Sequence, residues 1–212
     1  MLTKSISKNS LILGAFAIAS TALVTLTYIL TKPAIEQNKQ QKLMTTLSQV
    51  IDGNEYTNTL YLDCTEIAED YLNHSAPTKV YRAKKDGKPV AVVLQSTAPD
   101  GYSGNIEILS AIYIDGTIAG VRVIEHKETP GLGDKVEIRR SDWIKSFNGK
   151  RPTSIKDTTW AVKKDGGEFD AFTGATITPR AIISAVKRAS LYTQNQHQDL
   201  FNNANLCGVN ND

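Results

Sequence analysis

The order of hydrophobic and polar positions divides the chain into an apolar N-terminal segment and a longer segment of mixed pattern. Residues 10–30 contain no charged side chain. These 21 residues, at about 1.5 Å each, would span a hydrocarbon core of about 30 Å. Lys4, Lys8 and Lys32 flank the apolar stretch. The pattern predicts a transmembrane helix over 10–30, preceded by a short N-terminal segment at 1–9.

A cleaved signal peptide is the alternative interpretation, because Ala-Ile-Ala at 17–19 resembles a small-residue cleavage site. Cleavage there would leave an apolar region over 11–16 only, shorter than the usual ~7–15 residues, and apolar sequence continues beyond it. The length therefore favours an uncleaved anchor. Lysines on the two sides offset one another, so the positive-inside rule does not decide the orientation.

The pattern becomes polar after the apolar stretch. Pro33 is expected to end the membrane helix, and 34–51 is a Gln- and Lys-rich sequence with helical spacing of its few apolar residues. We expect a membrane-proximal helical stalk over 31–75. The strand and helix pattern from about Thr45 onward is complete in itself and predicts a domain that folds without the membrane helix.

Two pairs of strands, each joined by an Asp-Gly turn, follow the stalk. The strands and their turns are expected at 80–83, Asp86-Gly87, 90–94, 106–114, Asp115-Gly116 and 118–124. The segment between the two pairs, 97–105, is rich in Gly and Ser and contains Pro-Asp, which predicts a surface loop.

Helical spacing returns after the second pair. A helix is expected over 134–147, capped by Asp134 and with Ile138 and Trp143 facing inward, followed by a short strand over 160–162. A last helix is expected after Thr178 as its N-cap and Pro179 in its first turn. Its apolar residues at helical spacing are Ile182, Ile183, Val186 and Leu191.

This order of elements predicts an α+β fold with a largely antiparallel sheet and flanking helices. The domain is expected at 76–195, with a C-terminal tail at 196–212. Hydrophobic residues make up 41% and charged residues 22%, which is typical of a globular protein. A net charge of +2 gives no electrostatic case for a nucleic-acid partner.

The two cysteines, Cys64 and Cys207, belong to no CxxC pair, so we expect neither an iron–sulfur cluster nor another metal site. A disulfide joining the tail to the membrane-proximal region and two unrelated buried thiols are both open interpretations.

Small residues and hydroxyls precede the last helix, at Thr173, Gly174, Ala175 and Thr176. The N–H groups and the positive dipole end of such a helix favour a phosphate, and Arg180 adds a charge nearby. An ordinary capped turn is the alternative, and geometry alone favours it.

Two motifs resemble the FMN-binding domain family. Asp170 followed by Thr-Gly-Ala-Thr at 173–176 resembles its flavinylation motif, in which an FMN phosphate is esterified to the last threonine, here Thr176. His-Lys-Glu-Thr-Pro-Gly-Leu-Gly at 126–133 resembles its second signature. With the membrane helix and the length, the chain resembles the G-subunit family of Rnf-type ion-translocating electron-transport complexes, with the C subunit of sodium-translocating NADH:quinone reductase as a cousin.

The resemblance implies one covalent FMN and no catalytic residue in this chain itself. The second motif would contact the flavin, whereas a plain glycine-rich turn is the alternative. Asp170 would be recognised by the flavin transferase that attaches the cofactor, or would be a surface carboxylate. The second motif's flavin-contacting candidates are Glu128, Thr129, Gly131, Leu132 and Gly133.

The resemblance also implies a function and a location. The protein would relay electrons through its FMN to other membrane subunits. It would be anchored in lipid of the bacterial inner membrane, with residues 1–9 in the cytoplasm and its main domain in the periplasm. A membrane-anchored periplasmic binding or assembly module without redox activity is the alternative. It would leave both motifs unexplained.

Overall fold

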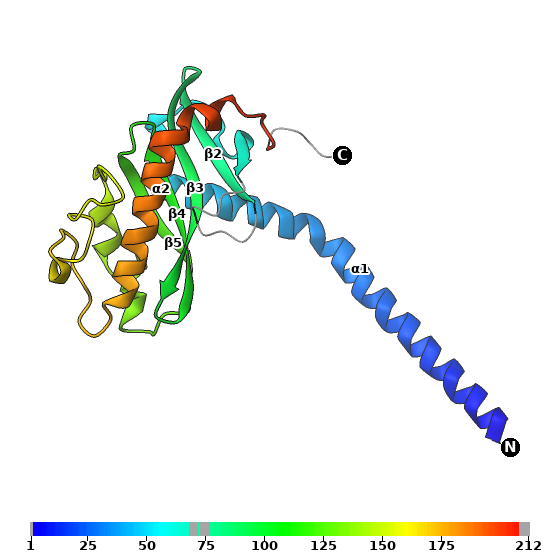
Figure 1. Ribbon diagram of the computed structural model, residues 1–212. Helices are drawn as coiled ribbons and strands as arrows, with labels where there is room; N and C mark the ends of the chain where they lie inside the picture. Colours follow the sequence, from blue (N-terminus) through cyan, green and yellow to red (C-terminus); the bar gives the residue numbers. More distant parts are fainter. Residues whose placement is uncertain (1, 68–71, 73–76, 208–212) are drawn as a thin grey trace. The chain divides into compact units, whose positions relative to one another are not determined.

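The computed structural model describes residues 2–67, 72 and 77–207 (Figure 1). The chain forms two compact units, Met1–Thr45 and Thr46–Asp212. The first is helical, and the second contains a five-stranded antiparallel sheet with helices. The α+β class with an N-terminal apolar helix is therefore confirmed.

Helix α1 (Leu2–Val50) begins in the apolar segment and continues through Pro33. Its stretch Asn9–Ile35 is long and apolar enough to cross a membrane, and its side chains are exposed in the structure. The expectation that Pro33 ends the helix is wrong. Proline removes one backbone hydrogen bond and can kink a helix, but the helix-forming sequences on both sides carry α1 past it.

The expected helical stalk over 31–75 is helical only as far as Val50. Asp52 accepts a hydrogen bond from the Asn54 N–H and starts the 3₁₀ turn η1 (Gly53–Glu55), which turns the chain away from the helix axis. A second turn, η2 (Leu60–Leu62), and strand β1 (Cys64–Ile67) follow. Residues 68–71 and 73–75 of the expected stalk lie outside the described residues.

The sheet is an antiparallel meander in chain order. Both expected Asp-Gly hairpins are present, and Asp86 and Gly87 have the positive φ angles, 51° and 77°, that a two-residue hairpin turn needs. After β1, its strands are β2 (Thr78–Lys85), β3 (Lys88–Gly101), β4 (Gly104–Tyr113) and β5 (Ile118–Glu125).

The surface loop expected over 97–105 is instead the tip of a long hairpin. β3 and β4 stay paired to Gly101 and Gly104, with only Tyr102 and Ser103 between them. Ala98 pairs with Ile106, and both are fully buried. Burial of this apolar pair outweighs the low strand propensity of the Gly-, Ser- and Pro-rich sequence, because strand propensity is weak compared with packing.

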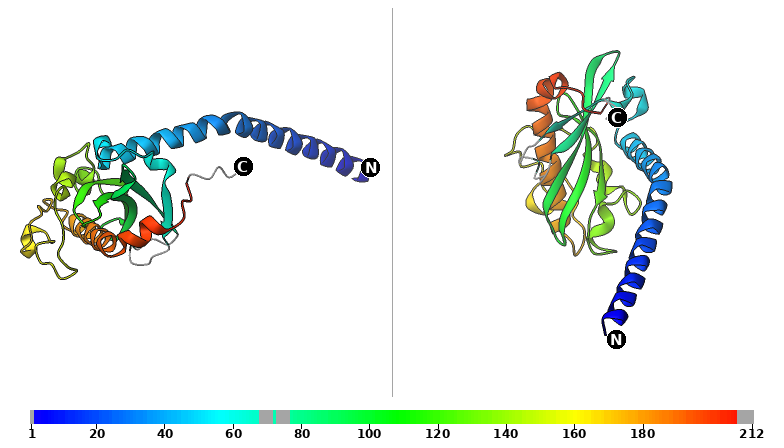
Figure 2. Two further views of the ribbon diagram at one scale, coloured as in Figure 1. Left: turned by 90° about the horizontal axis from the view of Figure 1, so that it is seen from above. Right: turned by 90° about the vertical axis from the view of Figure 1, so that its right-hand side faces the viewer.

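Helix α2 (Ile177–Asn202) covers one face of the sheet (Figures 1 and 2). Ile182, Ile183 and Val186 are buried in the main core with residues of β3 and β4. The buried Ser190 hydroxyl donates to the Gly116 carbonyl at 2.6 Å, which ties the middle of α2 to the turn between β4 and β5.

The helix expected over 134–147 is two 3₁₀ turns, η4 (Gly133–Val136) and η5 (Asp142–Phe147). Ser141 caps η5, whereas Asp134 accepts a hydrogen bond from the Gly131 N–H and caps no helix.

The strand expected over 160–162 is also absent. Val162 makes one isolated bridge to Phe169 before turn η6 (Lys163–Asp165). Aromatic side chains from these segments enter the core. Their packing stabilises the segments, which form no regular helix or strand there.

The face of the sheet opposite α2 also has buried neighbours. Leu47, Val50 and Ile51, at the end of α1 and just beyond it, are each at most 3% exposed. A Cβ added at Gly120 would lie 2.3 Å from the Val50 carbonyl oxygen, so the chain runs directly against β5 there. This segment belongs to the sheet-containing unit.

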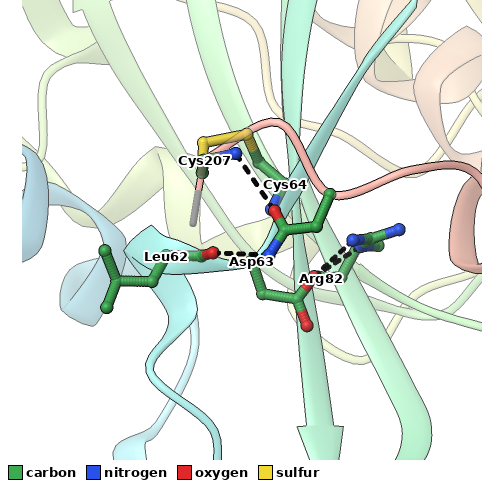
Figure 3. Close-up of a disulfide and its surroundings, with 6 residues drawn as sticks. Leu62, Asp63, Cys64, Arg82 and Cys207 are labelled. Atoms are coloured by element: carbon green, nitrogen blue, oxygen red, sulfur yellow. Dashed lines mark hydrogen bonds and ion pairs between the residues drawn. A yellow bond between two sulfur atoms is a disulfide. The ribbon is translucent and has the colours of Figure 1, made fainter. Parts of the chain in front are cut away.

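A disulfide joins Cys64, in β1, to Cys207, in the tail (Figure 3). The Asn205 side-chain oxygen accepts hydrogen bonds from the N–H groups of both cysteines, and its amide donates to the Leu62 carbonyl. The Leu206 N–H donates to the Cys64 carbonyl, so the tail covers the outer edge of β1.

The buried Arg82 guanidinium connects the same region. It donates to Asp63 at 2.6 Å (Figure 3) and also to the Asn203 carbonyl, at 2.6 Å. Although burial by itself raises the pKa of Asp63, hydrogen bonds from Lys84 and Arg82 hold it below its ordinary value. The ionised carboxylate therefore compensates the buried guanidinium charge.

A fragment beginning at Thr46 is expected to fold as an independent domain, whereas one beginning at Asp52 is expected to be markedly less stable. The shorter fragment lacks Leu47, Val50 and Ile51, whose burial contributes about 1.5–3 kcal/mol each. Urea unfolding followed by circular dichroism measures the difference. Equal midpoints for the two fragments would contradict this expectation.

Cys207→Ser is expected to lower the free energy of unfolding by about 2–4 kcal/mol, because the disulfide closes a long loop and restricts the unfolded chain. Unmutated protein in dithiothreitol is the control and should fall to the same value. Two thiols that react with a labelling reagent without reductant, in protein recovered from an oxidising compartment, would refute the pairing.

Candidate functional site

Three segments far apart in sequence meet at one pocket of about 350 Å³. They are the tip of the β3–β4 hairpin, the loop after β5, and the start of α2 with the loop before it. The pocket brings together the two motifs recognised in the sequence. Its lining residues are Tyr102, Glu128, Thr129, Leu132, Gly133, Gly174, Ala175, Thr176, Ile177 and Thr178.

Thr176 is the N-cap residue of α2, and its side chain makes no capping hydrogen bond. It is half-buried at the pocket wall. The backbone N–H groups of Ile177 and Thr178 belong to the first helical turn, where a helix offers no acceptor of its own. The Thr176 hydroxyl and the positive end of α2 therefore lie together at the pocket.

Thr178 is not the cap that the sequence suggested. It lies inside the helix, fully buried, and its hydroxyl donates to the Glu128 carboxylate. The helix begins earlier than expected because this side-chain bond, and not a capping bond, positions its first turn. Thr176 consequently lies directly at the helix start, two residues closer than expected.

Glu128 connects the walls of the pocket. The residue is 5% exposed. One oxygen accepts the Ser103 N–H at 2.9 Å, and the other accepts the Thr178 hydroxyl. A Cβ added at Gly133 would lie 2.9 Å from the Glu128 Oε2 atom, so only glycine fits beside the carboxylate. Glu128 thus holds the hairpin tip and the helix start together.

The backbone N–H groups at the glycines of the loop after β5 already have partners within the loop. The Leu132 and Gly133 N–H groups donate to the Thr129 carbonyl, and the Gly131 N–H donates to Asp134. Gly131 itself is absent from the pocket lining, as is Thr173. What this loop offers a ligand is the Thr129 side chain and the apolar Leu132 side chain.

His126 supports the same loop. Its Nδ1 atom accepts the Glu128 N–H at 3.1 Å, which leaves the ring proton on Nε2, 2.7 Å from Glu137. Hydrogen bonds from Arg139 and His126 lower the pKa of Glu137. Within the described part of the chain, no group of three or more His, Cys, Asp or Glu side chains could hold a metal ion.

Arg180 and Asp170 lie outside the pocket lining. Arg180 makes a two-point ion pair with Asp165, at 2.6 and 2.8 Å, and this hydrogen bonding lowers the pKa of Asp165. The Arg180 charge is therefore paired with Asp165 and lines no part of the pocket. Asp170 is exposed and pairs with Lys163 at 2.7 Å.

An aromatic cluster supports the loop before α2. Trp143 donates from Nε1 to the Asp170 carbonyl at 2.8 Å and meets the Phe172 ring edge-on at 5.1 Å. The Phe147 ring lies 4.7 Å from that of Phe169. These packed rings therefore support the loop that carries Thr176.

Sequence reasoning missed Tyr102 and Ile177 as lining residues. Tyr102 lies at the tip of the hairpin that the sequence presented as a loop, 26 residues before Glu128 in the chain. The available signal was Gly-Tyr-Ser-Gly at 101–104, in which two glycines flank an aromatic residue in a strand-ending turn.

The FMN-binding domain family matches residues 101–190, which contain the whole pocket lining. Residues 1–50 match a second family, the RnfG N-terminal region.

Relatives extend the match over nearly the whole chain. The G subunit of the ion-translocating oxidoreductase complex from Pseudoalteromonas atlantica is 48% identical, over 95% of this chain and 94% of that protein. The G subunit from Vibrio cholerae (strain Classical Ogawa 395) is 48% identical over 98% and 99%. The one from Erwinia tasmaniensis is 50% identical over 90% of each. The chain belongs to the family of G subunits of ion-translocating oxidoreductase complexes.

Thr178→Val is expected to lower the free energy of unfolding by about 1–3 kcal/mol, because it leaves a buried Glu128 oxygen without its donor. Thr176→Val is the matched control and should change stability by less than about 0.5 kcal/mol, since its hydroxyl makes no capping bond. Chemical denaturation measures both. Equal losses would show that the Glu128–Thr178 bond does not stabilise the helix start.

Proposed function

We propose that this protein is the FMN-carrying electron-relay subunit of a membrane-bound ion-translocating oxidoreductase complex. The observation that carries the proposal is the meeting of both FMN-family motifs at one pocket. Family membership and the candidate membrane helix support a membrane-anchored subunit with other subunits as partners.

We infer that a single FMN is attached covalently through its phosphate to the Thr176 hydroxyl. Three features support this residue: it is half-exposed, its hydroxyl is not used as a cap, and it lies at the positive end of α2. The helix dipole would stabilise the phosphate charge by about 0.3–1 kcal/mol. Because Arg180 is paired with Asp165, the dipole and the backbone N–H groups carry this role without it.

The pocket fits a flat ring system attached there. Gly174 has a φ of 81°, and a Cβ at this position would come within 3.7 Å of Leu132, so a side chain would narrow the space beside Thr176. Bound FMN supplies one- and two-electron redox chemistry. The chain's own residues hold it: Thr129 offers a hydroxyl to the ring edge, and Leu132 and Ile177 offer apolar surface.

Attachment requires another protein. A threonine hydroxyl is a weak nucleophile, and the neighbouring Thr178 and Glu128 side chains are bonded to each other and to Ser103. A separate flavin transferase therefore completes the chemistry. Asp170 is exposed beside this loop, as a recognition residue would be.

The domain is proposed to lie in the periplasm, with helix α1 in the bacterial inner membrane. The Cys64–Cys207 disulfide supports this side of the membrane, because disulfides persist in oxidising compartments. A binding or assembly module without redox activity has less support, since it explains neither FMN-family motif nor the match to the FMN-binding domain family.

Thr176→Ala is expected to abolish covalent FMN without unfolding the domain, because it removes the hydroxyl that forms the ester. Thr176→Ser should retain some attachment, and Thr173→Ala, outside the pocket lining, should keep most of it. Intact mass and peptide mapping from a host with the transferase measure the result. A flavin still bound covalently to Thr176→Ala, or an unmutated protein that never carries one, would exclude this site.

A further inference from the structure

The exposed apolar side chains of the sheet-containing unit gather at the pocket. Seven large hydrophobic residues are exposed among those the structure describes from Thr46 onward, and three of them line this pocket: Tyr102, Leu132 and Ile177. Tyr102 is the most exposed of the seven, at 68%. Exposed apolar groups gathered around a pocket mark a surface that a ligand covers.

The Tyr102 backbone is firmly held although its side chain is open to solvent. It lies in a two-residue turn between Gly101 and Gly104. A Cβ at Gly101 would lie 2.3 Å from the Gly104 carbonyl oxygen, and Gly104 has a φ of 106°. The next residue, Ser103, donates its N–H to the buried Glu128 carboxylate at 2.9 Å.

Glu128 therefore sets where the Tyr102 side chain stands relative to Thr176. The same carboxylate accepts the hydroxyl of Thr178, two residues after Thr176 in the chain. The buried carboxylate and the two glycines at the strand ends fix the backbone of the hairpin tip at the pocket. They do not bury the tyrosine ring.

The chemistry of the lining indicates what the ring would contact. Tyr102 is the one aromatic residue among the ten described lining residues, and the loop before α2 contributes the small residues Gly174 and Ala175. A flat aromatic ligand gains most from an aromatic face, and small residues leave room for it to enter. The isoalloxazine ring of FMN is such a ligand.

We propose that Tyr102 is a flavin-positioning residue whose ring covers one face of the isoalloxazine of the FMN attached at Thr176. This inference rests on the proposed function and adds a contact that neither sequence motif contains. The tyrosine shields that face from water and holds the ring against Leu132 and Ile177. Because Tyr102 is exposed, its replacement leaves the fold intact.

The test compares Tyr102→Phe and Tyr102→Ala with the unmutated protein, all produced with the flavin transferase. An excited flavin takes an electron from a phenol in contact with it and returns it, which quenches flavin fluorescence. Phenylalanine keeps the stacking surface but donates poorly, so Tyr102→Phe should fluoresce about threefold more, with quenching by iodide unchanged. Tyr102→Ala should fluoresce more and be quenched by iodide about twofold more strongly, because the ring is uncovered.

Intact mass separates this inference from the proposed function. An unchanged mass of covalent flavin in both variants, with the fluorescence and iodide changes above, supports the inference. Unchanged fluorescence and iodide quenching in flavin-loaded Tyr102→Ala would overturn it alone. A chain that carries no flavin even when unmutated overturns both.

Tyr61→Phe is the matched control, since Tyr61 lies on η2 and outside the pocket lining. Its flavin fluorescence should equal that of the unmutated protein. A rise as large as that of Tyr102→Phe would show that the quenching group is not at the hairpin tip, and would overturn the assignment.

Discussion

The buried carboxylate of Glu128 is the constraint on which the pocket depends. It accepts a backbone N–H from the hairpin tip and a hydroxyl from the start of α2, which are separated by 75 residues between Ser103 and Thr178. A carboxylate taken out of water must have such partners, and losing one is costly. Glu128 therefore fixes the hairpin tip and the start of α2 against each other, within elements that also share the hydrophobic core.

The rest of the domain keeps those segments in place. The aromatic cluster beneath the loop before α2 and the Ser190 bond to the Gly116 carbonyl hold the helix from two sides. At the other end, the disulfide and the Arg82–Asp63 pair attach the C-terminal tail to the edge of β1. A rigid frame suits a relay protein, since a cofactor that exchanges electrons with neighbouring subunits needs a defined position.

Much of the fold could be predicted from the sequence because the relevant signals are local. Asp-Gly turns between alternating apolar residues determine both hairpins through the φ angles at Asp86, Gly87 and Gly116. The apolar stretch of α1 and the spacing of Ile182, Ile183 and Val186 indicate their helices in the same way. The residues at 173–176 and 128–133 belong to two motifs of one family. Their resemblance to that family predicted that both segments form one site.

Tertiary packing decided what these local signals could not. The chain continues strand pairing to Gly101 and breaks 134–147 into 3₁₀ turns, each against its local pattern. The sequence predicts Thr178 as the N-cap of the last helix, yet its hydroxyl donates to Glu128. Arg180 pairs with Asp165, outside the pocket lining. The sequence alone determined which residues could carry the chemistry. Only the tertiary structure decided their partners, because buried polar groups select partners by proximity across the fold and not along the chain.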